Sequence, residues 1–219
     1  MTQALDGITV LDFTQGMAGS VATMILSDFG AEVIKIEPPE GDPYRAFPPS
    51  LLWNRGKKSV VLDLNDPDSV ENVCKLAERA DVVVETFRPG VADSLGIGYE
   101  ALKAVKPDLV YCSITGFGPK GPYSGYKDYD GLIEAKSGRL MTFAGISGRE
   151  GPSYAVVNAA SHAAAMATVR GVLSALMVRD KTGKGQRLET SILQAITYYD
   201  LTQFVLWQMM INFPETFDF

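Results

Sequence analysis

Few residues in this 219-residue sequence have types and spacings that suit catalysis. His162 is the only histidine, and there is neither a GxSxG elbow nor a GxxxxGK[ST] loop, so serine hydrolase chemistry lacks its residues. The cysteines Cys74 and Cys112 have no CxxC or Cys/His spacing, which predicts no metal site and favours buried thiols in a reducing cytosol. Gly16 and Gly19, in the run FTQGMAGS, would let an anionic group approach the backbone at a helix start.

Charge and hydropathy exclude other classes of protein. With 20 basic and 26 acidic residues, for a net charge of −6, the chain has no basic field that would hold DNA. The opening run MTQALDGITVLDF lacks the basic residues, apolar core and cleavage site of a signal peptide. Polar residues interrupt the long apolar run Val156–Val178, which argues against a membrane helix. We therefore expect a soluble, cytoplasmic protein with no nucleic-acid or membrane partner.

Apolar runs bounded by turn residues alternate with helical patterns along most of the chain. The expected strands are Ile8–Phe13, Glu32–Ile36, Ser59–Leu64, Asp81–Glu85 and Leu109–Ile114. The expected helices are Ala18–Phe29, Pro67–Arg79, Tyr99–Val105, Tyr129–Ser137, Val157–Val178 and Ser191–Ile211. Asp66 is the expected cap of the second of these helices, and Pro67 is its first residue. Strands that are apolar on both faces predict an α/β fold with a mostly parallel, Rossmann-like sheet flanked by helices.

The last part of the chain has two further features. From Gly183, the run GKGQRLETS predicts a loop that enters a short strand. The final expected helix, with QFVLWQMMINFPETFDF, carries large apolar side chains and no polar tail. Because an apolar surface of this size is seldom left in water, we expect this helix to pack on a partner chain or the natural protein to continue beyond it.

Several runs together resemble the family III CoA-transferases, the formyl-CoA transferase, carnitine CoA-transferase and benzylsuccinate CoA-transferase type. They are GITVLDF, FGAEVIKIEPPEGDPYR, WNRGKKSVVLDL, ADVVVETFRPGVADSLGIGYEALKAVKPDLVYCSITGFGPKGPY, YKDYDGLIEAKSG and RDKTGKGQRLETSILQA. They cover nearly the whole chain, and the combination of NRGKKS, ADVVVETFRPG and TGKGQ is specific. The resemblance implies that residues 1–219 are the N-terminal part of the family's large domain and of its interlocked fold.

The resemblance also implies a site for coenzyme A or acyl-CoA, as a substrate and not as a permanent cofactor, at the C-terminal edge of the sheet. Lys127, Tyr129 and Asp130 match a segment that contacts CoA in formyl-CoA transferase. Loop residues would supply cations and amides for the CoA phosphates, and a strand end would clamp the adenine or the pantetheine arm. The loop residues are Arg45, Asn54 and Lys57, and the strand-end residues are Phe87 and Arg88.

Members of this family use an aspartate that attacks the acyl-CoA thioester, and here its position is Ser161, ten residues before Gly171 in GVLSAL. A carboxylate forms a mixed anhydride that CoA thiolate can open, whereas a serine hydroxyl needs a base and forms a stable ester. His162 is adjacent in sequence, but on a helix it would point about a quarter-turn away. The resemblance therefore implies a scaffold that lacks its nucleophile.

Three hypotheses follow. The first is a non-catalytic subunit of a heteromeric CoA-transferase, which explains an intact scaffold without the aspartate. The second is an active homomeric CoA-transferase or acyl-CoA racemase in which another carboxylate, such as Asp128 or Asp130, serves. In the racemase branch a histidine and an aspartate act together, and this sequence has Lys127 and Ser161 in their places. The third is an acyl-CoA-binding protein without chemistry.

The resemblance further implies partners. Family III enzymes are interlocked dimers of chains roughly twice this length, so a related subunit or a second copy is expected beside acyl-CoA and a carboxylic acid. The family's second half supplies a small domain and a glycine-rich loop that this sequence does not contain. The sequence does not determine the acceptor acid.

Overall fold

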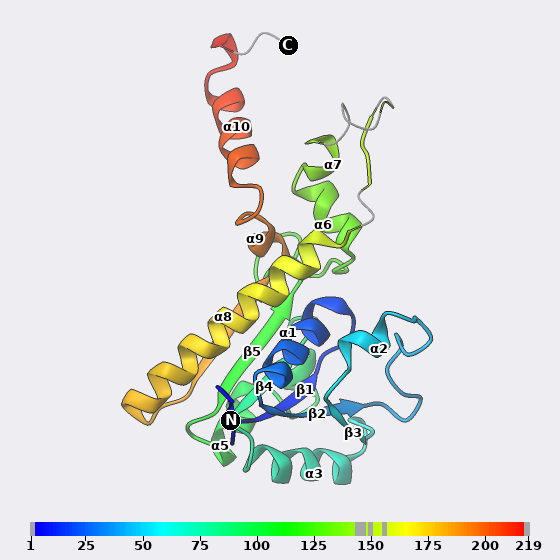
Figure 1. Cartoon of the computed structure of the whole chain (residues 1–219), viewed down its shortest axis with the longest axis vertical. Helices are drawn as coiled ribbons and strands as arrows, with labels where there is room; N and C mark the ends of the chain where they lie inside the picture. The colour runs from blue at the N-terminus through cyan, green and yellow to red at the C-terminus, as the bar shows by residue number, and fades with distance from the viewer. Residues whose placement is uncertain (1–2, 143–147, 149–150, 155–156, 217–219) are drawn as a thin grey trace.

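Six short strands form a parallel sheet in the computed structural model, which describes residues 3–142, 148, 151–154 and 157–216 (Figure 1). The strand order is β3-β2-β1-β4-β5-β6, and every neighbouring pair is parallel. The strands are β1 Thr9–Phe13, β2 Glu32–Glu37, β3 Lys58–Val61, β4 Val82–Glu85, β5 Val110–Thr115 and β6 Gln186–Ser191. The predicted α/β, Rossmann-like fold is confirmed, including the short strand after Gly183.

Helices cover both faces of the sheet (Figure 1). One apolar layer joins α1, α8 and α9 to one face, and a second layer joins α3, α4 and α5 to the other. The helices are α1 Met17–Asp28, α2 Ser50–Trp53, α3 Pro67–Ala77, α4 Val91–Ser94, α5 Tyr99–Val105, α6 Asp130–Lys136, α7 Arg139–Thr142, α8 Ala159–Thr182, α9 Ile192–Ile196 and α10 Leu201–Asn212. A 3₁₀ turn, Pro214–Thr216, follows.

The start of α3 forms as its sequence predicts. The Asp66 carboxylate accepts hydrogen bonds from the backbone N–H groups of Asp68 and Ser69, and Pro67 is the first helical residue. A proline at this position loses no hydrogen bond, because the first N–H groups of a helix have no partner within it. Three short helices, α2, α4 and α7, were not predicted, since four residues are too few for a helical hydrophobic period.

The single helix predicted for Ser191–Ile211 is wrong, because the chain turns between α9 and α10. The Ser191 hydroxyl caps α9 by accepting a hydrogen bond from the Gln194 N–H. The turn ends at Asp200, whose carboxylate forms an ion pair with Arg139 at the start of α7. A tertiary ion pair thus stabilises a break that the local sequence does not signal, and α10 extends away from the sheet (Figure 1).

One helix in the described part of the chain, α8, is long and apolar enough to span a membrane by length and composition alone. Half of its apolar window is buried, and it packs on α1, β5, β6 and α9. The structure therefore places α8 in the apolar layer on one face of the sheet.

Gly185, in the TGKGQ run, lies against the backbone that precedes β5. A Cβ atom there would lie 2.1 Å from the Leu109 carbonyl oxygen and 2.4 Å from the Asp108 carbonyl carbon. We expect Gly185→Ala to lower the free energy of unfolding by about 3 kcal/mol, because backbone must move to admit the methyl group. Urea denaturation measures this, with Gly125→Ala as the control, since nothing lies within 4 Å of a Cβ at Gly125. Equal stability of the two variants would contradict the close approach.

Candidate functional site

A cavity of about 480 Å³ lies where the strand order reverses. β2 and β3 lie on one side of β1, and β4, β5 and β6 lie on the other. Open α/β sheets bind ligands at this point, outside the carboxyl ends of the strands. We call it the switch-point cavity; its lining includes Gln15, Gly16, Met17, Ala18, Tyr44, Phe47, Trp53, Thr86, Asp128, Tyr129, Asp130, Tyr154, Asn158, Ser161 and Ile192.

The turn between β1 and α1 forms the floor of this cavity. Gly16 has a φ of 73°, which favours glycine, and a Cβ atom there would touch the Tyr44 ring at 3.4 Å. A Cβ at Gly19 would lie 2.4 Å from the Thr14 side chain. Both glycines in FTQGMAGS thus allow close packing, and no side chain caps α1, so its first N–H groups stay available to an anionic ligand.

A buried polar network around Asp12 holds this turn in place. Asp12 Oδ1 accepts hydrogen bonds from the Thr14 N–H, at 2.8 Å, and the Thr14 hydroxyl, at 2.6 Å. Asp12 Oδ2 accepts from the Thr23 hydroxyl at 2.7 Å and from Lys57 Nζ at 2.8 Å. The Lys35 ammonium donates to the Thr14 carbonyl oxygen at 2.6 Å. The turn is therefore fixed by charges from three separate segments of the chain.

Two predicted residues, Asp130 and Ser161, meet in the wall of the cavity. Asp130 Oδ1 accepts hydrogen bonds from the Ser161 N–H, at 2.7 Å, and from the Ser161 hydroxyl, at 2.6 Å. Both residues are buried, and Asp130 Oδ2 has no hydrogen-bond partner within the described part of the chain. The serine hydroxyl is thus engaged with a carboxylate, one of whose oxygens remains unused.

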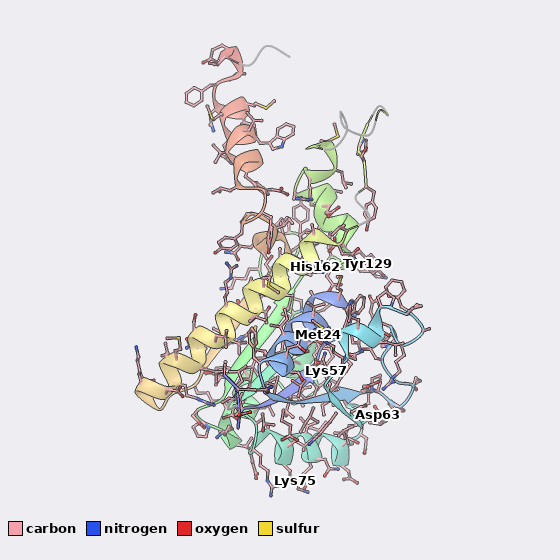
Figure 2. All side chains as sticks on the ribbon, in the orientation of Figure 1. Met24, Lys57, Asp63, Lys75, Tyr129 and His162 are labelled. Carbon is pink, nitrogen blue, oxygen red and sulfur yellow. The ribbon has the colours of Figure 1, made fainter. Side chains whose placement is uncertain are left out.

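His162 does not act as a base for Ser161. Its ring is exposed, and Nδ1 lies 2.9 Å from the Asn158 carbonyl oxygen, which can only accept a hydrogen bond (Figure 2). Nδ1 therefore carries the proton in this contact. The sequence-based expectation that His162 points away from Ser161 agrees with this geometry.

The structure distributes the other predicted CoA-binding residues over separate sites. Tyr129 lines the switch-point cavity, whereas Phe87 and Arg88 line a neighbouring cavity of about 240 Å³ beyond the end of β4. Lys127 is exposed and stacks over the Tyr129 ring, with Nζ 5.5 Å from the ring centroid. The remaining three residues, Arg45, Asn54 and Lys57, line a third cavity of about 260 Å³.

Two of the predicted cations in that third cavity are already paired. Arg45 forms a double hydrogen bond with the Glu37 carboxylate, with both distances 2.7 Å. The Lys57 side chain is 2% exposed, and its ammonium lies 2.8 Å from the Asp12 carboxylate. Their role as ligands of CoA phosphates stays a prediction, and each would have to share its charge with an internal carboxylate.

Sequence reasoning missed the aromatic wall of the switch-point cavity. Tyr44 and Phe47 come from the proline-rich loop after β2, and Trp53 comes from α2, which follows this loop. Tyr154 comes from the segment before α8. No regular hydrophobic period marks these residues. Their only signal in the sequence is an unusual number of aromatic side chains in a segment that also contains prolines.

The carboxyl of Glu85, in the neighbouring cavity, has a shifted pKa. Burial raises the pKa of Glu85 to about 6, although the Ser113 hydroxyl and the Phe87 N–H, at 2.6 Å, donate hydrogen bonds that lower it. A raised pKa in the folded state means that the contribution of Glu85 to stability is complete below the unfolded pKa, near 4.5, and is lost as the pH rises through about 6. The loss amounts to roughly 2 kcal/mol.

We therefore expect that, as the pH rises from 4 to 7, the free energy of unfolding of Glu85→Gln increases by about 2 kcal/mol relative to that of the natural chain. Urea denaturation across this pH range measures the difference. Glu37→Gln is the control of opposite sign, because Arg45 and its neighbours hold the pKa of Glu37 at about 2 against the effect of burial. A pH-independent difference for Glu85→Gln would show that folding does not change the pKa of Glu85.

Comparisons with known proteins agree with this architecture. The profile of CoA-transferase family III matches residues 5–215. The chain is 39% identical to acetyl-CoA:oxalate CoA-transferase of Acetobacter aceti over 198 residues, which are 85% of this chain and 50% of that protein. It is 38% identical to succinyl-CoA:mesaconate CoA-transferase of Haloarcula hispanica over 208 residues, 86% of this chain and 52% of that protein.

Two solved structures also superpose closely on this chain. The crystal structure of Rv3272 from Mycobacterium tuberculosis superposes with a TM-score of 0.88 and 33% identity over 94% of this chain and 58% of that one. A CAIB/BAIF family protein from Brucella suis gives a TM-score of 0.87 and 35% identity over 95% of this chain and 58% of that one. The chain spans about half the length of the curated relatives that it matches.

Proposed function

This chain belongs to CoA-transferase family III, and we propose that it binds acyl-CoA in the switch-point cavity as the non-catalytic subunit of a CoA-transferase. The observation that supports this role is the contact between Ser161 and Asp130. At the position where the family resemblance places a nucleophilic carboxylate, a hydroxyl donates a 2.6 Å hydrogen bond to another side chain.

The chemistry of a serine opposes the family's reaction cycle. In that cycle a carboxylate attacks the thioester carbonyl, and CoA thiolate leaves. The thiolate then attacks the enzyme carbonyl of the mixed anhydride, which releases the acyl group as a free carboxylate and leaves an enzyme-bound CoA thioester. An ester formed on Ser161 would be a poor acyl donor, and CoA thiolate would not open it at a useful rate. A subunit of this kind would hold the thioester, while a related subunit supplies the nucleophile.

A second candidate function is an active transferase in which Asp130 is the nucleophile. It is favoured by the free Oδ2 oxygen of Asp130, which is buried in the wall of the cavity and has no hydrogen-bond partner within the described residues. Ser161 would then hold Oδ1 and orient the attacking oxygen.

The remaining sequence predictions fit either candidate. We propose that residues 1–219 are the N-terminal part of the large domain of a cytoplasmic protein that acts on acyl-CoA and a carboxylic acid. We also propose that Tyr129 and Asp130 face the acyl end of CoA while Phe87 and Arg88 face its nucleotide end. The exposed apolar side chains of α10 support an assembly with a related subunit or a second copy, because water seldom covers such a surface. They include Leu201, Val205, Met209 and Ile211.

The test combines binding with a search for a covalent adduct. We expect calorimetric titration to detect binding of acetyl-CoA, and intact-mass spectrometry after incubation with succinyl-CoA to find no CoA adduct on this chain. Transfer activity should appear only when a related family III subunit is added. An adduct on this chain that disappears in Asp130→Asn would replace the first candidate with the second, and one that persists would contradict both.

A further inference from the structure

The switch-point cavity has an aromatic wall and an acidic rim, and from these we infer that it accepts an aromatic acyl group and disfavours an acyl group that ends in a second carboxylate. This inference rests on the proposed binding of acyl-CoA and adds the class of its acyl group. The volume of about 480 Å³ falls within the range of roughly 300–1,000 Å³ that is usual for small-molecule sites.

Three of the four rings in the aromatic wall, those of Tyr44, Phe47 and Trp53, pack against one another. The Phe47 and Trp53 ring centroids are 5.8 Å apart with planes at 52°, and those of Tyr44 and Trp53 are 6.4 Å apart with planes at 58°. Trp53 is 7% exposed, whereas Phe47 is 51% exposed and has surface left to cover. Tilted rings at these distances are a favourable arrangement, and an aromatic acyl group would extend it with a further ring.

Buried charges hold this wall in place before any ligand arrives. The Tyr44 N–H donates to Asp42 Oδ1 at 2.8 Å, and Asp42 Oδ2 pairs with the buried Lys35 ammonium at 2.9 Å. The same lysine donates to the Thr14 carbonyl oxygen in the floor of the cavity. Because Lys35 holds both the wall and the floor in place, binding of a rigid ring costs little conformational entropy of the protein.

The charges at the cavity disfavour a dicarboxylic acyl group. Asp128 and Asp130 both line it, and no lysine or arginine does so among the residues that the structure describes. Burial, followed by Asp128, Tyr129 and Asp42, raises the pKa of Tyr44, so its hydroxyl stays neutral. A terminal carboxylate would lose water and approach two like charges, and the free N–H groups at the start of α1, which carry a partial charge of about +0.5, would offset only part of this cost.

The test measures the affinity of the whole chain for free CoA, acetyl-CoA, phenylacetyl-CoA and succinyl-CoA by isothermal titration calorimetry. We expect phenylacetyl-CoA to bind at least about tenfold more tightly than succinyl-CoA or acetyl-CoA. Equal affinity for phenylacetyl-CoA and succinyl-CoA, or tighter binding of succinyl-CoA, would overturn the inference and leave the proposed binding of acyl-CoA intact. Absence of binding by all four compounds would overturn the proposed function and the inference with it.

Two variants separate the wall from the rim. Phe47→Ala should lower the affinity for phenylacetyl-CoA several-fold without changing the affinity for free CoA, because the ring is half exposed and its removal does not open the core. Leu52→Ala is the matched control, since this residue is 59% exposed in the same segment and lines neither the switch-point cavity nor the third cavity. Asp128→Asn should raise the affinity for succinyl-CoA more than the affinity for phenylacetyl-CoA. If Phe47→Ala and Leu52→Ala have the same effect, the aromatic wall does not contact the acyl group.

Discussion

Replacing Lys57 with methionine is expected to lower the free energy of unfolding by about 3–5 kcal/mol, the cost of leaving a buried charge without its partner. Asp12 is 0% exposed and the Lys57 side chain is 2% exposed, so neither charge can recover its hydration. Methionine keeps an unbranched apolar chain as far as Cε and removes the ammonium group. Urea denaturation at pH 7 measures the loss.

The neighbouring residue supplies the control. Lys58 also forms an ion pair, with Glu32, but its side chain is 69% exposed, so Lys58→Met should cost less than about 1 kcal/mol. Adding Asp12→Asn to Lys57→Met should restore part of the stability, since the amide oxygen can still accept from Thr14. If Lys57→Met and Lys58→Met were equally stable, the buried pair would contribute nothing.

The cost of Lys57→Met should also depend on pH. Burial by itself raises the pKa of Asp12, but Lys57 and then Lys35 lower it, and hydrogen bonds bring it below its ordinary value. A lowered pKa in the folded state contributes stability above the unfolded pKa and loses it as the pH falls through the folded value. The penalty of Lys57→Met should therefore shrink in acid, where the uncompensated Asp12 carboxylate takes up a proton.

Replacing Ser161 with aspartate is expected to change the chain from one that carries no covalent adduct to one that forms an enzyme-bound CoA thioester. The Ser161 side chain lies in the wall of the switch-point cavity. The substitution therefore puts a carboxylate beside the proposed position of the thioester carbonyl. Gain of a competent nucleophile should raise the rate of adduct formation on the order of 10³-fold or more. Intact-mass spectrometry after incubation with phenylacetyl-CoA, followed by borohydride reduction, detects the adduct.

Ser161→Asn is the matched control, because it has the shape of aspartate without its nucleophilic oxygen. Asp130 lies within 2.6 Å of the Ser161 hydroxyl, so two carboxylates here would share a proton and the rate of adduct formation should rise with pH. Equal behaviour of the two variants would mean that the side chain at position 161 does not reach the thioester. An adduct on the unsubstituted chain would instead favour Asp130 as the nucleophile.

Much of the scaffold was predictable because its signals are local. The strand run at Val82–Glu85 is apolar without alternation, as a strand buried on both faces must be, and Asp66 with Pro67 marks the start of α3. The break at Asp200 was not predictable, since the residue that stabilises it, Arg139, is 61 residues away. Local pattern thus specifies an element, and long-range contacts decide where it ends.

The same distinction between local pattern and long-range contact applies to the candidate site. Ser161 and Asp130 were both singled out in the sequence, but their hydrogen bond joins residues 31 positions apart and belongs to the tertiary fold. Lys57 appears in the sequence as a loop cation for phosphate, and only the fold shows its ammonium buried against Asp12, 45 residues earlier. The sequence by itself determined the sheet and the family, because these depend on the order and type of residues. The tertiary structure alone decided which charges are paired and which rings face the cavity, because burial and contact are properties of segments that meet only in the folded chain.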